Sequence, residues 1–178
     1  MIGQFLRENK YAAGIWLFLR LYLGWTWLTL GWGKVTGGFH AGGYLQGSAA
    51  NPVMSGEAVL YPNYVAFLEN VAIPNADAFS VMVAWGELLV GLGLILGVFT
   101  SAAAFFGVVM NMSFLFAGTI STNPWMIMIS MFIIAAGANA GRYGGDRWVL
   151  PYLKSVVFKN KNNKKGFGAT EQNLSEAV

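Results

Sequence analysis

Four long apolar stretches constrain the fold of this chain more than any other feature. They run over residues 14–33, 78–98, 101–118 and 124–140. A helix needs about 20 residues to cross the hydrocarbon core of a bilayer, and the first two stretches reach that length. Backbone groups in lipid must be satisfied within a helix or a closed barrel, and these stretches lack the alternation of barrel strands. The pattern predicts an all-α, polytopic membrane protein built as a four-helix bundle.

Composition supports a membrane protein. Of the 178 residues, 56% are hydrophobic and 11% are charged, which is too apolar for a soluble domain of this size. A signal peptide is the alternative for the first stretch, with Arg7 and Lys10 as its basic flank. That apolar run is too long for a signal peptide, and it contains Arg20. We expect one membrane domain over residues 1–150, followed by a basic and then disordered tail over residues 151–178.

The basic residues predict the orientation. Nine of the eleven lysines and arginines lie before the first stretch or after the fourth. The positive-inside rule therefore places both termini in the cytoplasm of a multi-pass protein of the cell membrane. The net charge of +3 does not indicate a nucleic-acid partner, because the basic tail is suited to anionic lipid headgroups.

The absence of cysteine and the single histidine exclude several redox sites. Iron–sulfur ligation and thioether attachment of haem both need cysteine, and a bis-histidine haem needs two histidines. His40 also lies outside the apolar stretches. Any redox chemistry must use a diffusible or non-covalent cofactor, or a partner protein.

The segment over residues 34–77 is the one long connection that we predict, and it lies on the outer side. Its second half, "PNYVAFLENVAIPN", spaces its apolar residues as on a helix. We expect a short amphipathic helix over residues 64–71 that ends before Pro74. Two interpretations remain open: a lid over a pocket, or an interfacial helix that only packs.

One face of the first stretch carries two cations. Arg20, Gly24, Trp27, Gly31 and Lys34 follow each other at spacings of 4, 3, 4 and 3, which places them on one helix face. Glycines on such a face allow a neighbouring helix to approach closely. We therefore expect Arg20 to point into the bundle, with Lys34 at the outer mouth.

The other three stretches each carry a polar residue at mid-depth: Glu87, Asn111 and Ser130. An intramembrane charge is costly unless it is paired, so we predict that Arg20 contacts Glu87 directly or through one ligand or water. Asn111 would satisfy the remaining hydrogen-bonding groups. A pair of this kind either clamps the helices or forms a functional site.

Several motifs resemble the DoxX/DoxD family of four-helix membrane proteins. They are "LRLYLGWTWLTLGWGK", "PNADAFSVMVAWGELLVGLGLILGVFTSAAA", "MNMSFLFAGTISTNP" and "GRYGGDRW", and the likeness covers about residues 14–148. By this resemblance, Arg20, Glu87 and Asn111 match the polar residues of the first three family helices, and Asp146 matches the acidic residue after the fourth.

The resemblance implies a redox function, since the DoxD branch is a subunit of thiosulfate:quinone oxidoreductase. We expect Glu87 and Arg20 as catalytic residues at a quinone or a small anionic substrate. The substrate-binding residues would be Arg20, Asn111, Trp27, Lys34, Phe114 and Ser130, with the rings of Trp27 and Phe114 flanking the ligand.

The partners expected are the bilayer and a soluble redox subunit, and a homo-oligomer is left open. The alternative function is a non-enzymatic membrane module that assembles a redox partner or passes a small solute, with "GRYGGDRW" and the basic tail as its docking surface.

Overall fold

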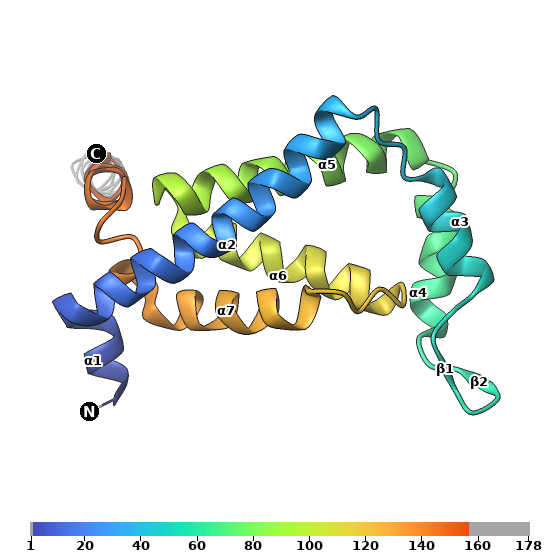
Figure 1. Cartoon of the computed structure of the whole chain (residues 1–178), viewed down its shortest axis with the longest axis horizontal. Coiled ribbons are helices and arrows are strands. Elements are labelled where there is room, and N and C mark those ends of the chain that lie inside the picture. Colours follow the sequence, from blue (N-terminus) through green and yellow to red (C-terminus); the bar gives the residue numbers. More distant parts are fainter. Residues whose placement is uncertain (1, 157–178) are drawn as a thin grey trace, which may run out of the picture.

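The computed structural model describes residues 2–156, and this part of the chain is mostly helical, as predicted (Figure 1). The elements are α1 (Ile2–Glu8), α2 (Lys10–Thr36), α3 (Gly42–Ala50), β1 (Met54–Ser55), β2 (Ala58–Val59), α4 (Pro62–Phe67), the π-helix η1 (Leu68–Ala72), α5 (Ala76–Leu96), α6 (Thr100–Phe116), α7 (Asn123–Ala136) and the 3-10 helix η2 (Gly137–Asn139). A last helical segment covers residues 146–156 and passes the expected domain boundary at residue 150. The remainder of the predicted tail lies outside the described residues.

The four long helices α2, α5, α6 and α7 correspond to the four apolar stretches. They lie side by side: α2 packs on α5 and α7, and α6 packs on α5 and α7. Helix α2 begins earlier than its apolar stretch, because the Asn9 side chain accepts hydrogen bonds from the backbone N–H groups of Tyr11 and Ala12. Among the described helices, Ala76–Leu96 alone is both long and apolar enough by itself to cross a membrane, whereas α6 and α7 are apolar but shorter.

Glycines fix the register between α2 and α5. A Cβ added to Gly24 would lie 3.0 Å from the Leu94 Cβ, and one added to Gly31 would collide with the Leu88 backbone. A Cβ on Gly91 would collide with the Leu28 backbone in the same way. The two helices are therefore antiparallel and touch along their backbones, as the glycine spacing predicts, and association in lipid depends on such close van der Waals contact.

The core between the long helices is apolar and tightly closed. Leu23, Leu94, Ala104 and Ile133 each have no exposed surface, and one comes from each of the four helices. The core is therefore filled by apolar side chains from all four long helices.

The connection between α2 and α5 forms a small unit of its own at one end of the bundle. The predicted helix over residues 64–71 is confirmed, as α4 followed by η1, and it ends two residues before Pro74. Leu68 and Ala72 of η1 are buried against Ala41 and Leu45 of the preceding segment. At the opposite end of the bundle lie α1 and the helix over residues 146–156, and α1, α3 and α4 all run across the direction of the long helices (Figure 1).

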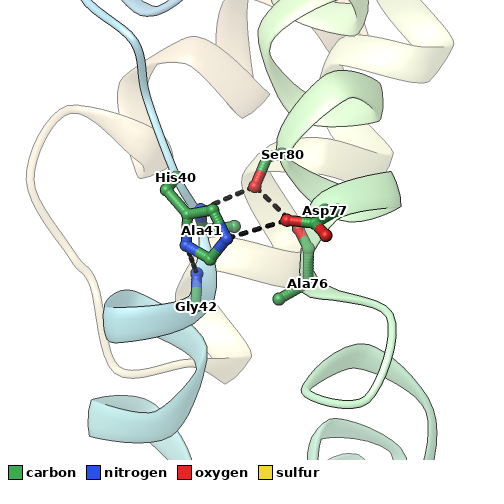
Figure 2. Close-up of polar contacts among 6 residues, drawn as sticks. All are labelled: His40, Ala41, Gly42, Ala76, Asp77 and Ser80. Carbon is green, nitrogen blue, oxygen red and sulfur yellow. Dashed lines mark hydrogen bonds and ion pairs between the residues drawn. The ribbon is translucent and has the colours of Figure 1, made fainter.

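Polar contacts fasten this unit to the first turns of α5 (Figure 2). The Ala41 backbone N–H donates to the Ser80 Oγ at 2.8 Å, and the His40 Nε2 lies 3.0 Å from the Asp77 Oδ1. The Gly42 N–H donates to the His40 Nδ1 at 3.1 Å. With Nδ1 acting as an acceptor, neutral His40 carries its proton on Nε2 and donates it to Asp77.

Candidate functional site

A buried ion pair joins α2 to α5 near the α3–α4 end of the bundle. The Lys34 Nζ donates to the Glu87 Oε2 at 2.6 Å. The Glu87 side chain is 1% exposed and the Lys34 side chain is 22% exposed, so the pair reaches solvent only through the lysine. Lys34 Nζ also lies 5.5 Å from the centroid of the Phe39 ring, a cation–π distance. The glycine-fixed register produces this pairing, because Gly31 brings the backbone at Leu88 against the last turns of α2.

The prediction that Arg20 contacts Glu87 is wrong. Within residues 2–156, Glu87 is paired with Lys34, while Arg20 donates from Nη1 to the Ala140 carbonyl at 3.1 Å and from Nη2 to the Tyr143 carbonyl at 3.2 Å.

The physical reason is the depth at which each helix meets its neighbour. Contact between Arg20 and Glu87 would require residues 14 and 98 to lie at about the same level. In the structure, α2 continues well beyond the end of α5, and Arg20 lies beside Gly97. Gly31 lies at the level of Leu88, the residue after Glu87. Gly31 is about 16 Å from Arg20 along the axis of α2, so Arg20 and Glu87 lie at different depths.

Arg20 acts as a clamp between three segments of the chain. Its guanidinium is 1% exposed, and a Cβ added to Gly97 would collide with its Nη1. A Cβ on Gly144 would lie 2.6 Å from the same atom. Arg20 thus binds carbonyl groups that follow α7 and η2, where helix ends leave acceptors free. The guanidinium fits there because Gly97 and Gly144 have no side chain.

Asp146 caps α6. Its Oδ1 accepts from the Phe99 N–H at 2.7 Å and its Oδ2 accepts from the Thr100 N–H at 3.0 Å. The carboxylate is 5% exposed, and it lies where the helix dipole favours negative charge. The motif "GRYGGDRW" therefore contains a structural connector in Gly141 and Asp146, both buried, rather than a wholly exposed docking surface.

We expect the replacement Asp146→Ala to lower the free energy of unfolding by about 1–2 kcal/mol, because two backbone N–H groups at the start of α6 lose their acceptor. Asp146→Asn should have an intermediate effect, since the amide retains one accepting oxygen. Thermal unfolding of the purified protein measures both. The control is Glu57→Ala, which removes an exposed carboxylate from the turn between β1 and β2. Equal effects at the two positions would contradict the capping role.

The remaining predicted polar residues are buried in the bundle. Trp27, Asn111 and Ser130 are each at most 1% exposed. Glu87 is at the level of Asn111, because a Cβ on its neighbour Gly86 would lie 3.3 Å from the Met110 Sδ. Arg20 is therefore not at the level of Glu87 and Asn111, and Lys34 is the cation that pairs with Glu87 there.

An apolar cavity of ≈ 960 Å³ opens between α5 and α6. Its wall is almost entirely carbon, and its end near α3 and α4 is aromatic. The aromatic residues there are Phe39, Tyr44, Tyr64, Phe67, Phe79 and Phe114. Of these, sequence reasoning assigned only Phe114 to a site, where it meets Tyr44 edge-on at 6.2 Å. The helical spacing over residues 64–71 was the available signal for Tyr64 and Phe67.

Tyr64 ties the covering helix to the cavity wall. Its hydroxyl donates to the Ser113 carbonyl at 2.9 Å. Burial, with a smaller contribution from Tyr44, raises the pKa of Tyr64 to about 12, so the phenol keeps its proton at neutral pH. Since Tyr64, Phe67 and Leu68 line the cavity, α4 and η1 form its cover, and this favours the lid interpretation.

Comparison with known proteins identifies one family. The family model described as DoxX matches residues 15–119, which is more than half of the chain. No curated protein and no solved structure matches. The matched region includes Arg20, the Lys34–Glu87 pair, Asn111 and the cavity-lining residues, whereas Ser130 and Asp146 lie beyond it.

Proposed function

We propose, from the premise that this chain belongs to the DoxX family of membrane proteins, that it is the membrane subunit of a quinone-linked oxidoreductase system. The observation that carries the proposal is the apolar cavity whose aromatic end adjoins the buried Lys34–Glu87 pair. Phe39 connects the two, because it lines the cavity and its ring lies 5.5 Å from Lys34 Nζ.

The cavity suits a ligand with a planar ring and a long apolar tail. The aromatic end offers edge and face contacts to a ring, and such contacts are favourable beyond the area they bury. The lining residues of α5 extend from Phe79 to Leu96, about 25 Å along the helix, and they are mainly aliphatic. An isoprenoid tail matches this length and polarity, and some of the lining side chains, such as Leu89 and Leu96, are exposed at the surface.

A bound quinone would supply two-electron, two-proton chemistry. On the protein side, Glu87 is the acid–base group and Lys34 holds its carboxylate in place. Lys34 is partly exposed and so connects the pair with water at the α3–α4 end. Arg20 is left out of this site, and its role in the proposal is structural. With no cysteine and one histidine in the chain, electrons would come from a separate soluble subunit. The family resemblance implies that this separate subunit oxidises thiosulfate.

A quinone-retention experiment tests the proposal. Val83→Trp would fill the cavity, because Val83 lines it, whereas Val81→Trp places the same bulk on the same helix at a position that is 60% exposed. We expect quinone in an organic extract of the wild-type protein and of Val81→Trp, and at least a several-fold loss in Val83→Trp. No quinone in the wild type, or equal amounts in both variants, would contradict the proposal.

The membrane arrangement is part of the proposal. We infer that α2, α5, α6 and α7 span the bilayer, with α3 and α4 on the outer face. The apolar character of α5, α6 and α7 supports this, as do the short helices that run across the bundle at its ends (Figure 1). The Lys34–Glu87 pair would then face the outer side.

The expected topology follows from the basic residues. A reporter that is active only in the cytoplasm, fused after Val178, should be active, and one inserted between β1 and β2 should be silent. The second fusion is the control, because that turn lies at the opposite end of the bundle from α1 (Figure 1). Activity in the β1–β2 fusion and silence in the Val178 fusion would reverse the orientation.

A second candidate function is a non-enzymatic membrane module that assembles a redox partner. It is favoured by the helix over residues 146–156, where Trp148 is 70% exposed and Tyr152 is 69% exposed, one turn apart. For this candidate, a redox protein should copurify with the wild type. If it also copurifies with Val83→Trp but not with Trp148→Ser, the result would support this candidate over a quinone site.

A further inference from the structure

We propose that Trp27, Asn111 and Ser130 form an internal water-binding site in the bundle, separate from the apolar cavity. Each of the three comes from a different helix and is at most 1% exposed. Four of their polar atoms have no hydrogen-bond partner within residues 2–156: Trp27 Nε1, Asn111 Oδ1, Asn111 Nδ2 and Ser130 Oγ. This inference does not depend on quinone binding.

Asn111 and Ser130 behave differently from similar residues in the same structure. The Ser113 hydroxyl donates to the carbonyl four residues earlier at 3.0 Å, and the Asn123 amide does so at 2.8 Å. Thr26 and Asn70 form the same local bond. Within the described part of the chain, neither Asn111 nor Ser130 forms it, although each lies well inside a helix with such a carbonyl nearby. Their polar atoms are therefore satisfied neither by their own helices nor by another described residue.

Water is the ligand that these atoms fit. Trp27 Nε1 and Asn111 Nδ2 are donors, Asn111 Oδ1 is an acceptor, and the Ser130 hydroxyl can serve as either. A buried water usually forms about three hydrogen bonds to groups that would otherwise be unsatisfied. Folded proteins rarely leave buried polar groups without partners, so the four atoms of these three residues need an explanation.

Gly107 allows the indole N–H to lie directly against α6. A Cβ at Gly107 would lie 3.1 Å from the Trp27 Nε1, which is closer than a Cβ normally packs. Asn111 follows Gly107 by one turn on the buried face of α6. The indole N–H and the amide therefore lie on the same side of that helix.

Ser130 approaches the same region from α7. It lies between Met126 and Ile133 on the buried face of that helix, and both of these pack in one core cluster with Trp27. On the side toward Arg20, the fully buried Leu23 and Leu94 close the bundle. Water would thus reach the site from the α3–α4 end, where Glu87 lies level with Asn111.

The indole proton of Trp27 gives a direct test. Protein labelled with 15N-tryptophan and placed in lipid nanodiscs should show a cross-peak between this proton and long-lived water, with Trp27→Phe identifying the signal. We expect Ser130→Ala and Asn111→Leu each to weaken the cross-peak several-fold. Absence of the cross-peak in the wild type, or unchanged intensity in both variants, would overturn the proposal.

A stability measurement distinguishes a Ser130 hydroxyl that binds water from one that has no hydrogen-bond partner. If Ser130 Oγ binds water, Ser130→Ala removes a hydrogen bond and should lower the Tm. If the hydroxyl has no partner, its removal relieves an unsatisfied group and should raise the Tm. Ser113→Ala is the matched control, because that hydroxyl is satisfied within its own helix. A higher Tm for Ser130→Ala than for the wild type would overturn the proposal.

Discussion

The replacement Gly97→Ala is expected to prevent stable folding. Gly97 ends α5 with φ at 65°, in the left-handed region that is costly for residues with a side chain. A Cβ there would also collide with the Arg20 guanidinium and approach the Gly144 Cα to 2.9 Å. Arg20 cannot retreat, because both of its Nη atoms bind carbonyl groups. We expect a loss above about 4 kcal/mol, seen as loss of monodisperse protein after extraction.

Gly118→Ala is the matched control for backbone strain. Gly118 has φ at 85°, but a Cβ there would meet its nearest atom, the Val53 Cγ2, at an ordinary 3.5 Å. Its cost should therefore be limited to about 1–2 kcal/mol from the left-handed backbone alone. If Gly97→Ala and Gly118→Ala unfold at the same temperature, the tight packing of Arg20 is not what makes Gly97 necessary.

The second large effect is expected at the ion pair. Lys34→Met should destabilise the protein by about 3–5 kcal/mol, because the Glu87 carboxylate would remain buried without its counter-charge. The double variant Lys34→Met with Glu87→Leu removes both charges and should recover thermal stability. If the pair also serves the proposed quinone site, the recovered double variant should still lack quinone-linked activity.

An arginine control distinguishes the observed pairing from the one that the sequence suggested. The double variant Arg20→Met with Glu87→Leu should show no rescue, since the two residues bind different partners. It should instead show the sum of the two single effects, as expected for separated sites. If Arg20→Met, and not Lys34→Met, restored stability when combined with Glu87→Leu, the Lys34–Glu87 pairing would be contradicted.

The positions of the long helices could be predicted from the amino-acid sequence. Apolar stretches of this length must satisfy their backbone groups internally, which explains why α2, α5, α6 and α7 appear where the stretches lie. The helix at Tyr64 was also predictable, since the apolar spacing and the prolines at 62 and 74 are local signals. The burial of Arg20, Glu87, Asn111 and Ser130 followed from the cost of polar groups in an apolar segment.

Which of these polar groups contact each other depends on how the helices pack. Helix α2 continues past the end of α5, and contacts at Gly24, Gly31 and Gly91 set the register, so Glu87 lies beside Lys34. A helix face repeats every few residues, and sequence spacing alone leaves the sliding of one helix along another undetermined. The cavity arose in the same way, because its lid and its walls are distant in sequence and become neighbours only when the segment between α2 and α5 folds back over α6.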